Sequence, residues 1–296
     1  MLGSISQIHD NTRRHFLQEY SEHVGRNVIL YATAWLQRND PATTSIAPVD
    51  ITGFMETLYG LDGEELDLII HSPGGSGETS EQIISYLRKK FKSIRAIIPH
   101  SAMSAATMLA CGCDEIWMGK QSSIGPIDPQ FILQTPLGVQ AVPAQAIMDQ
   151  FEQAKSDCTN NPNLASVWYP ILAQYGPGLL KQAENQTKLG KTLVQQWLRE
   201  HMFKNLPPRT RRSRAKKAAD RLSDHNKHLS HGRNIDRDKA RGFGLTVNDL
   251  ESDQTLQDLA LTVYHATNHT FSQTAAAKII ENQNGRAFII LSQAHR

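Results

Sequence analysis

The chain has 296 residues, of which 40% are hydrophobic and 20% are charged. This composition is typical of folded domains and excludes a disordered, collagenous or disulfide-stapled chain. Lysine and arginine total 31, against 29 aspartate and glutamate residues, which gives a formal net charge of +2. A charge so close to zero excludes attraction of the whole protein to nucleic acid or to an anionic membrane.

The cysteines and the N-terminal sequence indicate the compartment. Cys111, Cys113 and Cys158 form no C-x-x-C pair, which favours reduced thiols over a disulfide or a metal site. The sequence MLGSISQIHDNTRRHF lacks the apolar core of a signal peptide, and no run of about 18 apolar residues follows. We therefore expect a cytoplasmic protein without a membrane span and without a bound metal.

The first half of the chain alternates short apolar runs with amphipathic segments. The runs predict buried strands, and the segments with helical spacing predict helices. The expected strands cover 27–32, 66–70, 94–98 and 115–118, and the expected helices cover 48–61, 77–91 and 104–110. This alternation predicts an α/β fold with a parallel sheet that helices cover on both faces.

The second half is predicted to be mostly helical. After a loop at 124–129 we expect a short strand at 137–142, several helices, and an edge strand at 287–291. The expected helices cover 143–157, 164–175, 178–201, 210–222 and 253–282. We therefore divide the chain into an α/β core, residues 1–142, and a helical extension, residues 143–296, which packs on the core and can be continuous with it.

Two turns in the core carry residues suited to acyl-transfer chemistry. The first, Ser72 to Gly77, follows a strand, and its glycines allow backbone N–H groups to point into a crevice and stabilise an oxyanion. The second places Ser104 among small residues at a strand-to-helix turn, as in a nucleophile elbow. A glycine turn alone is usually structural and a serine there is usually a helix cap, so the indication comes from their combination.

The sequence around these turns resembles a known family. The segments IIHSPGGSGETSEQI, IIPHSAMSAATMLACGCDEIWM and SSIGPIDPQ are similar to the Clp-fold serine peptidases, within the Clp and crotonase superfamily. They most resemble the serine dehydrogenase proteinase family, related to signal peptide peptidase A. A later segment, SHGRNIDRDKARGFGLTV, resembles one that these proteins carry after their helical region. The resemblance covers the chain from about Asn27 to Phe288.

The resemblance implies an activity and several residue roles. It implies a cofactor-independent serine endopeptidase with a Clp/crotonase-like core, a polypeptide substrate and a homo-oligomeric assembly. Ser104 matches the nucleophile, and the backbone N–H groups of Gly75 and Ala105 match the oxyanion hole. The substrate is expected to lie extended beside Gly74, Ser76 and Gly77.

The general base is open at this stage. Clp peptidases use histidine and aspartate, but no histidine lies between His100 and His201; signal peptide peptidase A uses lysine. We therefore expect Lys155 to be the base, which requires burial to lower its pKa. A solvated surface lysine is nearly as consistent with the pattern, and His100 and Lys120 are further candidates for the base.

Four other polar residues stand out, each with an ordinary structural interpretation beside the functional one. Asp128 could orient the base or shape the substrate groove, although a turn carboxylate before proline is commoner. His225, His228 and His231 recur every third residue, but no carboxylate or cysteine completes a metal ligand set. We expect these histidines to be solvated turn residues.

Three other functions compete with the peptidase. A crotonase-type enzyme would act on acyl-thioesters with the same oxyanion geometry, and a catalytically silent scaffold would only bind partner proteins. The basic run from Arg209 to Lys217 could bind a nucleic acid, but no aromatic residues interleave it, so we do not expect a nucleic acid partner. A solvated helix face or a subunit contact is the simpler interpretation of that run.

Overall fold

The computed structural model describes residues 2–135 and 138–292, with no side chains described before residue 10. Its centre is a seven-stranded sheet in the order β10-β5-β3-β2-β1-β11-β12. Five of these strands are parallel, whereas β11 is antiparallel to both β1 and β12. The strands are β1 (Asn27–Thr33), β2 (Glu65–His71), β3 (Ser93–Ile98), β5 (Glu115–Met118), β10 (Val247–Asp249), β11 (Ala276–Asn282) and β12 (Ala287–Leu291).

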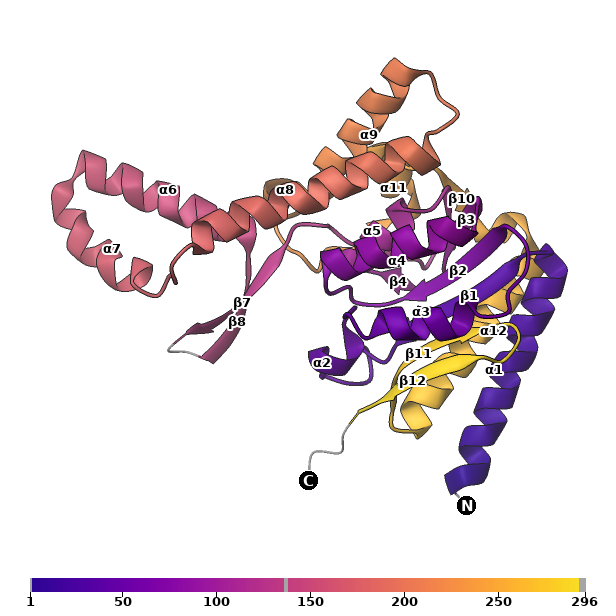
Figure 1. The fold of residues 1–296 in the computed structure, drawn as a ribbon. Helices are drawn as coiled ribbons and strands as arrows, with labels where there is room; N and C mark the ends of the chain where they lie inside the picture. Colours follow the sequence, from indigo (N-terminus) through magenta and orange to yellow (C-terminus); the bar gives the residue numbers. More distant parts are fainter. Residues whose placement is uncertain (1, 136–137, 293–296) are drawn as a thin grey trace.

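Helices cover both faces of this sheet, which explains why its strands are apolar without alternation. In β2 every residue after Glu65 is buried. One face packs on α3, α4 and α5, and the other packs on α1 and α12, which lie side by side (Figure 1). These helices are α1 (Leu2–Val24), α3 (Asp50–Leu58), α4 (Gly77–Lys90), α5 (Ala105–Cys111) and α12 (Gln254–Gln273).

Two smaller sheets and the remaining helices complete the chain. The short strands β4, β6 and β9 form a three-stranded sheet, and β7 pairs with β8 as a separate antiparallel pair. Their bounds are β4 (Ser101–Ala102), β6 (Ser123–Ile124), β7 (Gln130–Thr135), β8 (Gly138–Pro143) and β9 (Ile235–Asp236). The further α-helices are α2 (Pro41–Thr44), α6 (Ala144–Asn160), α7 (Ala165–Leu172), α8 (Leu179–Trp197), α9 (Pro208–Leu222), α10 (His225–His228) and α11 (Arg237–Phe243).

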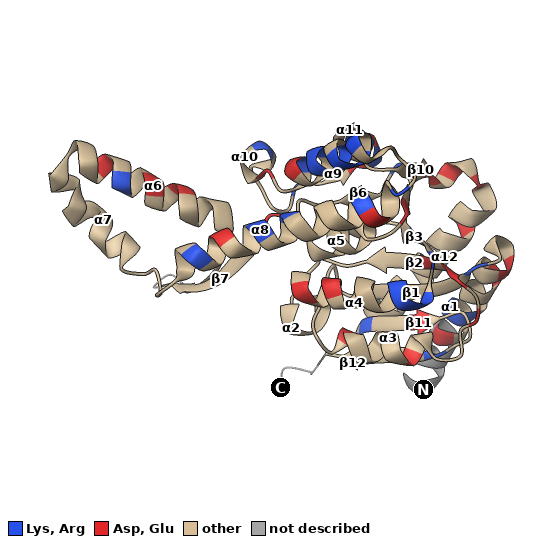
Figure 2. Ribbon diagram, turned by 45° about the horizontal axis from the view of Figure 1, so that its top comes forward, with Lys and Arg blue, Asp and Glu red and all other residues tan. Residues whose placement is uncertain are grey.

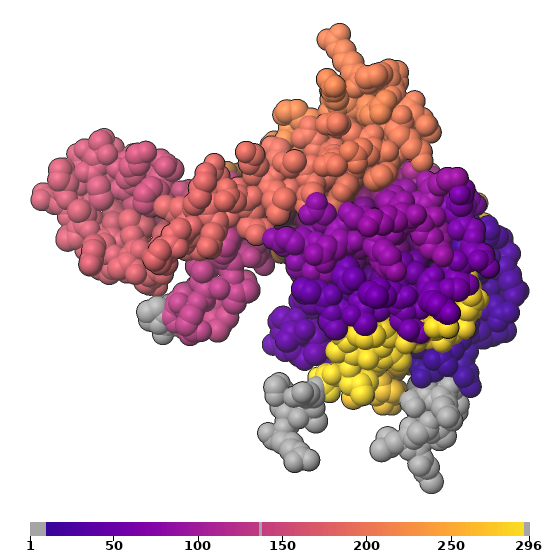
Figure 3. All heavy atoms as spheres, viewed as in Figure 1, coloured from indigo at the N-terminus to yellow at the C-terminus, as the bar shows by residue number. Residues whose placement is uncertain are grey.

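One part of the chain projects from the core as an arm, which we define as β7, β8, α6, α7 and the first half of α8 (Figures 1 and 3). Helix α8 connects the arm to the core: its C-terminal end buries Leu193, Val194 and Trp197, and a π-helical turn (Leu198–Met202) continues it. Its N-terminal half packs on α6. The arm therefore contacts the core mainly at its base.

The structure confirms the expected α/β fold with a parallel sheet between helices. It also confirms the edge strand at 287–291, which is β12. The prediction of helix over the whole of 253–282 is wrong after Gln273, because 276–282 forms β11. The expected strand at 137–142 is β8, except that Leu137 lies outside the described residues.

The second half of the chain contributes to the central sheet as well as to helices. Strand β10 forms one edge of the sheet, and β11 and β12 form the other. The long N-terminal helix α1 also packs against α12 from the C-terminal region. Among the described residues, no helix is both long and apolar enough to cross a membrane.

Candidate active site

Ser104 lies in a strained turn between β4 and α5. Its backbone has φ 53° and ψ −119°, a conformation that residues with a side chain rarely adopt. Thr107 helps to hold the turn, because its hydroxyl donates to the Ala102 carbonyl oxygen at 2.8 Å. Such a turn lifts the serine hydroxyl away from the backbone, as in a nucleophile elbow.

The glycine turn packs directly against Ser104. Gly74 has φ 99°, and a Cβ atom there would lie 2.7 Å from Ser104 Cβ and 2.8 Å from the Ala105 nitrogen. A side chain at position 74 would therefore push the two turns apart. Within the described part of the chain, the amides of Gly75 and Ala105 donate no hydrogen bond. Two unpaired N–H groups beside the serine are suited to receive an oxyanion.

Ser76 and Gly77 connect this turn to α4. Ser76 caps the helix, because its hydroxyl accepts a hydrogen bond from the Thr79 amide at 3.0 Å. Glu78 in the first turn bonds to the Ser76 hydroxyl and, at 2.9 Å, to Gln186 of α8. The turn is thus tied to the base of the arm.

Asp128 holds two histidines from a distant part of the chain. The carboxylate is buried, and its two oxygens lie 2.9 Å from His231 Nδ1 and 2.8 Å from His225 Nδ1. Burial alone would raise the pKa of Asp128, but hydrogen bonds and charge from the two histidines outweigh it and hold the pKa below its ordinary value. Asp128 is therefore ionised near neutral pH and only accepts hydrogen bonds.

The ionised carboxylate determines the tautomer of His231. Because Asp128 cannot donate, the proton of a neutral His231 ring resides on Nδ1. Nε2 of that ring then carries the lone pair and is able to accept a proton. A neutral His231 held in this way has a free acceptor at Nε2.

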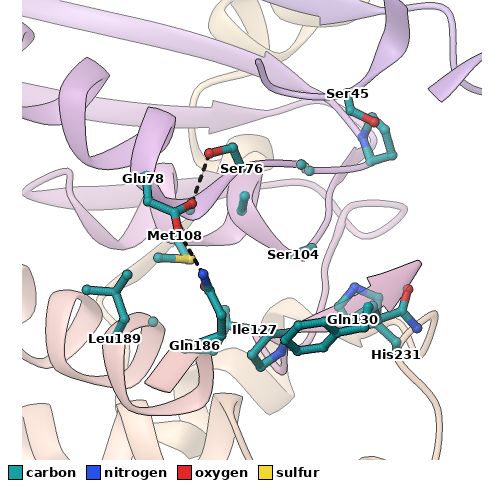
Figure 4. A pocket seen from close by; sticks show the side chains of 18 of the residues that line it. Ser45, Ser76, Glu78, Ser104, Met108, Ile127, Gln130, Gln186, Leu189 and His231 are labelled. Atoms are coloured by element: carbon teal, nitrogen blue, oxygen red, sulfur yellow. Dashed lines mark hydrogen bonds between the residues drawn. The ribbon is translucent and has the colours of Figure 1, made fainter. Parts of the chain in front are cut away.

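One cavity brings His231 and Ser104 together. It has a volume of about 640 Å³, and both residues line it, together with the glycine turn (Figure 4). Its other walls come from β7 and α8 and are mostly apolar. The lining includes Gly74, Gly75, Ser76, Gly77, Ser104, Ala105, Met108, Ile127, Gln186, Leu189, Leu193 and His231. Ser104, His231, Gly75 and Ala105 therefore all line the same cavity.

The residues expected to supply the base lie elsewhere. Lys155 is on α6 in the arm, its side chain is 66% exposed, and its ammonium lies 3.5 Å from the Glu152 carboxylate. Lys120 is also exposed, and its amide donates to Glu251. His100 contacts the His71 ring and, at 3.1 Å, the Ser101 hydroxyl. The structure brings none of these three into the cavity with Ser104.

The three recurring histidines do not all face one point. Among the described residues, no group of three or more His, Cys, Asp or Glu side chains is placed to hold a metal ion. His228 Nε2 lies 2.7 Å from the Arg221 carbonyl oxygen, whereas His225 and His231 both face Asp128. The expectation that all three are solvated turn residues is wrong, because His228 is buried and the other two are mostly buried.

The basic run forms the exposed face of α9 (Figure 2). Arg214 packs over the Phe203 ring and donates to the Gly244 carbonyl oxygen at 2.6 Å, and Lys216 pairs with Asp220. The remaining cations of the run point mostly to solvent. Two of the six cations of the run are therefore committed to these intramolecular contacts, and none of the run lines the cavity.

The contact between His231 and Asp128 is the feature of the site that the sequence does not predict. The two residues lie 103 positions apart, so no local pattern links them. The signal was present in the segment SHGRNIDRDKARGFGLTV, which contains His231 and shares the family resemblance.

This geometry, a serine in a strained turn with a carboxylate-held histidine and free amides, defines a serine-hydrolase type of site on an α/β fold. Residues 60–168 match the model of the ClpP-like SDH-type serine proteinases. The matched part of the chain includes the glycine turn, Ser104 and Asp128.

Two uncharacterized proteins of Methanocaldococcus jannaschii are similar in sequence. MJ0137 is 35% identical over 120 residues, which are 40% of this chain and 37% of that protein. MJ1495 is 48% identical over 65 residues, which are 22% of each chain. The matched region is thus well under half the length of either relative.

Among solved structures, the chain is similar to mutants of the 1510-N membrane-bound stomatin-specific protease. A lysine-to-alanine mutant in complex with a substrate peptide is 13% identical, with a TM-score of 0.38 over 66% of this chain and 64% of that chain. A serine-to-alanine mutant is 19% identical, with a TM-score of 0.28 over 39% of this chain and 58% of that chain.

Proposed function

We propose that the chain is a serine endopeptidase in which Ser104 is the nucleophile, His231 the general base and Asp128 the residue that orients the base. One observation carries the proposal: Ser104 and His231 line one cavity, and His231 is held there through Nδ1 by a buried, ionised carboxylate. This is the arrangement that activates a serine hydroxyl near neutral pH.

The proposed reaction has two halves. Ser104 Oγ attacks the peptide carbonyl carbon while its proton passes to His231 Nε2, and Asp128 stabilises the imidazolium that forms. The tetrahedral intermediate collapses as the amine leaves with the proton from His231, which produces an acyl-enzyme. Water then attacks the ester carbonyl and gives a proton to His231; the second tetrahedral intermediate collapses, the carboxylic acid product leaves, and His231 returns the proton to Ser104 Oγ. The proposed mechanism needs no cofactor.

We propose the amides of Gly75 and Ala105 as the oxyanion hole. Both amides lack partners among the described residues and lie beside Ser104. Loss of one donor in such a site typically costs about 100- to 1,000-fold in rate. The substrate would run extended past Gly74, Ser76 and Gly77, where backbone groups could pair with it as an added strand.

A serine–lysine dyad through Lys155 is less well supported than this arrangement. A lysine base must be neutral, which requires burial away from carboxylates, whereas Lys155 is exposed and paired with Glu152. Lys155 could reach Ser104 only through a large movement of the arm or from a neighbouring copy. We therefore assign the base to His231.

We propose that the arm joins copies of the chain into a homo-oligomer. Helix α7 has the apolar sequence ASVWYPIL, yet none of its residues is buried within one copy, and Val167 and Tyr169 are 60% and 75% exposed. The paired strands β7 and β8 also stand apart from the larger sheets, and an isolated pair is marginally stable in water. A second copy would cover these surfaces.

We further propose a cytoplasmic location and no nucleic acid partner. The three cysteines are free, and two of them are buried, as expected of reduced thiols in a reducing compartment. The exposed cations of α9 lack the aromatic side chains that would stack on bases.

The test combines covalent labelling with hydrolysis of peptides. A fluorophosphonate should add to the wild-type protein, and peptide mapping should locate the adduct on Ser104; Ser104→Ala should neither label nor cleave a mixed peptide library. Cleavage of acyl-thioesters but not peptides would favour the crotonase-type enzyme. A wild-type protein that is folded and assembled but does not label would favour the silent scaffold.

A further inference from the structure

A second feature near the cavity is a fully buried ion pair that the mechanism does not use. Lys278 of β11 and Asp50, the first residue of α3, have no exposed side-chain surface, and Lys278 Nζ lies 2.6 Å from Asp50 Oδ1. Burial lowers the pKa of Lys278, although Asp50 opposes that effect. Placing two charges out of water is costly unless the remaining donors and acceptors are also satisfied.

Those remaining groups are satisfied by neighbouring residues. The Tyr31 hydroxyl donates to Asp50 Oδ2 at 2.6 Å, and the Ala47 amide donates to the same oxygen at 3.1 Å. Lys278 Nζ donates a second hydrogen bond, 2.7 Å long, to the backbone carbonyl oxygen of Ser45. The ion pair thus holds the segment just before α3 from two sides, at Ser45 and at Ala47.

That segment contacts the glycine turn of the cavity. Ile46, between the two held residues, donates from its amide to the Gly74 carbonyl oxygen at 2.7 Å, and its own carbonyl accepts from the Ser76 amide at 2.9 Å. Ile46 and Gly75 therefore form a parallel bridge. A Cβ on Gly75 would lie 2.5 Å from the Ile46 nitrogen and oxygen, so the two backbones are in close contact.

We propose that Lys278 is a positioning residue: by holding the Ser45 carbonyl it fixes Ile46, and Ile46 fixes the direction of the Gly75 amide at the oxyanion hole. This inference rests on the proposed function of Ser104 and Gly75. It explains why β11, which enters the sheet from the C-terminal region, carries a lysine at a fully buried position. Lys278 does not touch the substrate.

The test compares two buried ion pairs on opposite faces of the same strand. Lys278→Met combined with Asp50→Asn removes both charges, while the amide oxygen still accepts from Tyr31 and Ala47. The matched control is Arg13→Met with Glu281→Gln, because Arg13 and Glu281 are also an ion pair with no exposed side-chain surface. Glu281 lies three residues after Lys278, on the face that packs on α1.

The measurement is fluorophosphonate inactivation, analysed as a maximal rate and a binding constant. We expect the Lys278 variant to lose 10- to 100-fold in maximal rate, because the phosphoryl oxygen needs the same amide as the oxyanion. Its binding constant should change less than threefold. The Arg13 variant should lose thermal stability but keep the wild-type rate.

A milder variant tests the inference even if the double variant at Lys278 and Asp50 does not fold. Tyr31→Phe removes only the hydroxyl that donates to Asp50, and we expect a two- to fivefold lower maximal rate with unchanged binding. If wild type labels normally, and Tyr31→Phe and the folded Lys278 variant label like the Arg13 control, the inference is wrong while the proposed function stands. If wild type itself fails to label, the proposed function is wrong.

Discussion

The core and the arm of this protein differ in how they are stabilised. Strands β1 and β2 are buried along almost their whole length, and the two titratable groups proposed for catalysis, Asp128 and His231, lie outside the arm and are hydrogen-bonded to each other. In the arm, α7 has no buried residue, and α6 buries only Ala144, Ile147 and Ala154. The core is therefore packed within one copy, whereas much of the arm is left exposed there, as the proposed homo-oligomer requires.

The largest expected effect is at Asp128 in the core. Asp128→Asn should lower peptide cleavage and fluorophosphonate labelling by about 100- to 10,000-fold, because an amide can donate to His231 and favour the wrong tautomer. The labelling rate at pH 7.5 measures this. His225→Gln is the control, since His225 bonds the other carboxylate oxygen outside the cavity lining. Equal losses in the two variants would contradict the proposal that Asp128 acts through His231 rather than through His225.

Packing in the two regions should respond differently to truncation. Leu68→Ala in β2 leaves a cavity at a fully buried position and should lower the free energy of unfolding by about 2–5 kcal/mol. Val167→Ala in α7 should change it by less than about 0.5 kcal/mol, because that side chain is exposed within one copy. Urea denaturation of dilute protein measures both. A similar loss of unfolding free energy in Leu68→Ala and Val167→Ala would mean that Val167 is packed within a single copy.

The core should also lose stability in mild acid. Burial, with a smaller contribution from His100, lowers the pKa of His71 from 6.5 to about 3. Between pH 3 and pH 6.5 the His71 ring binds a proton in the unfolded chain but not in the folded chain. The contribution of neutral His71 to the free energy of unfolding is therefore complete above pH 6.5 and is lost as the pH falls toward 3. At pH 5 the loss amounts to about 2 kcal/mol.

The variant that tests this is His71→Phe, whose ring fits among the aromatic rings of Trp35, His100 and Tyr264. Between pH 7.5 and pH 5, the free energy of unfolding of this variant should fall by about 2 kcal/mol less than that of the wild-type protein. The control is His265→Gln at an exposed position of α12. An unchanged pH dependence in His71→Phe would show that His71 is accessible to protons in the folded chain.

The smallest expected effect concerns assembly through the arm. Tyr169→Asp places a charge on the exposed face of α7 and should weaken self-association about tenfold or more, equivalent to about 1.4 kcal/mol. Sedimentation over a range of concentrations measures it. Asp149→Asn, elsewhere on the arm, serves as a comparison. A Tyr169 variant that assembles like wild type would exclude α7 from the interface.

The sequence predicted the part of the fold that depends on local pattern. The runs at 27–32, 66–70, 94–98 and 115–118 are continuous and apolar, and all of them are strands of the central sheet. Strand β11 was missed because its sequence AAKIIEN contains a lysine, a glutamate and an asparagine that are fully buried. Their partners lie more than 220 positions away, so no local periodicity reveals the strand.

The site also has a part that the sequence predicts and a part that it does not. Ser104 and the glycine turn lie within one strand–helix–strand unit, where turn chemistry is visible in a short segment. His231 reaches Asp128 across 103 positions, through the arm and α9, and only the three-dimensional structure shows that path. The amphipathic pattern around Lys155 favours it as the base, but the helix that carries it, α6, lies in the arm.

The most direct test of the account is the pH dependence of labelling at Ser104 in three proteins: wild type, His231→Gln and Lys155→Ala. We predict that His231→Gln labels at least 100-fold more slowly than wild type at every pH, and that Lys155→Ala labels within twofold of wild type with the same pH profile. Full labelling of His231→Gln together with loss of labelling in Lys155→Ala would contradict the account and assign the base to the arm.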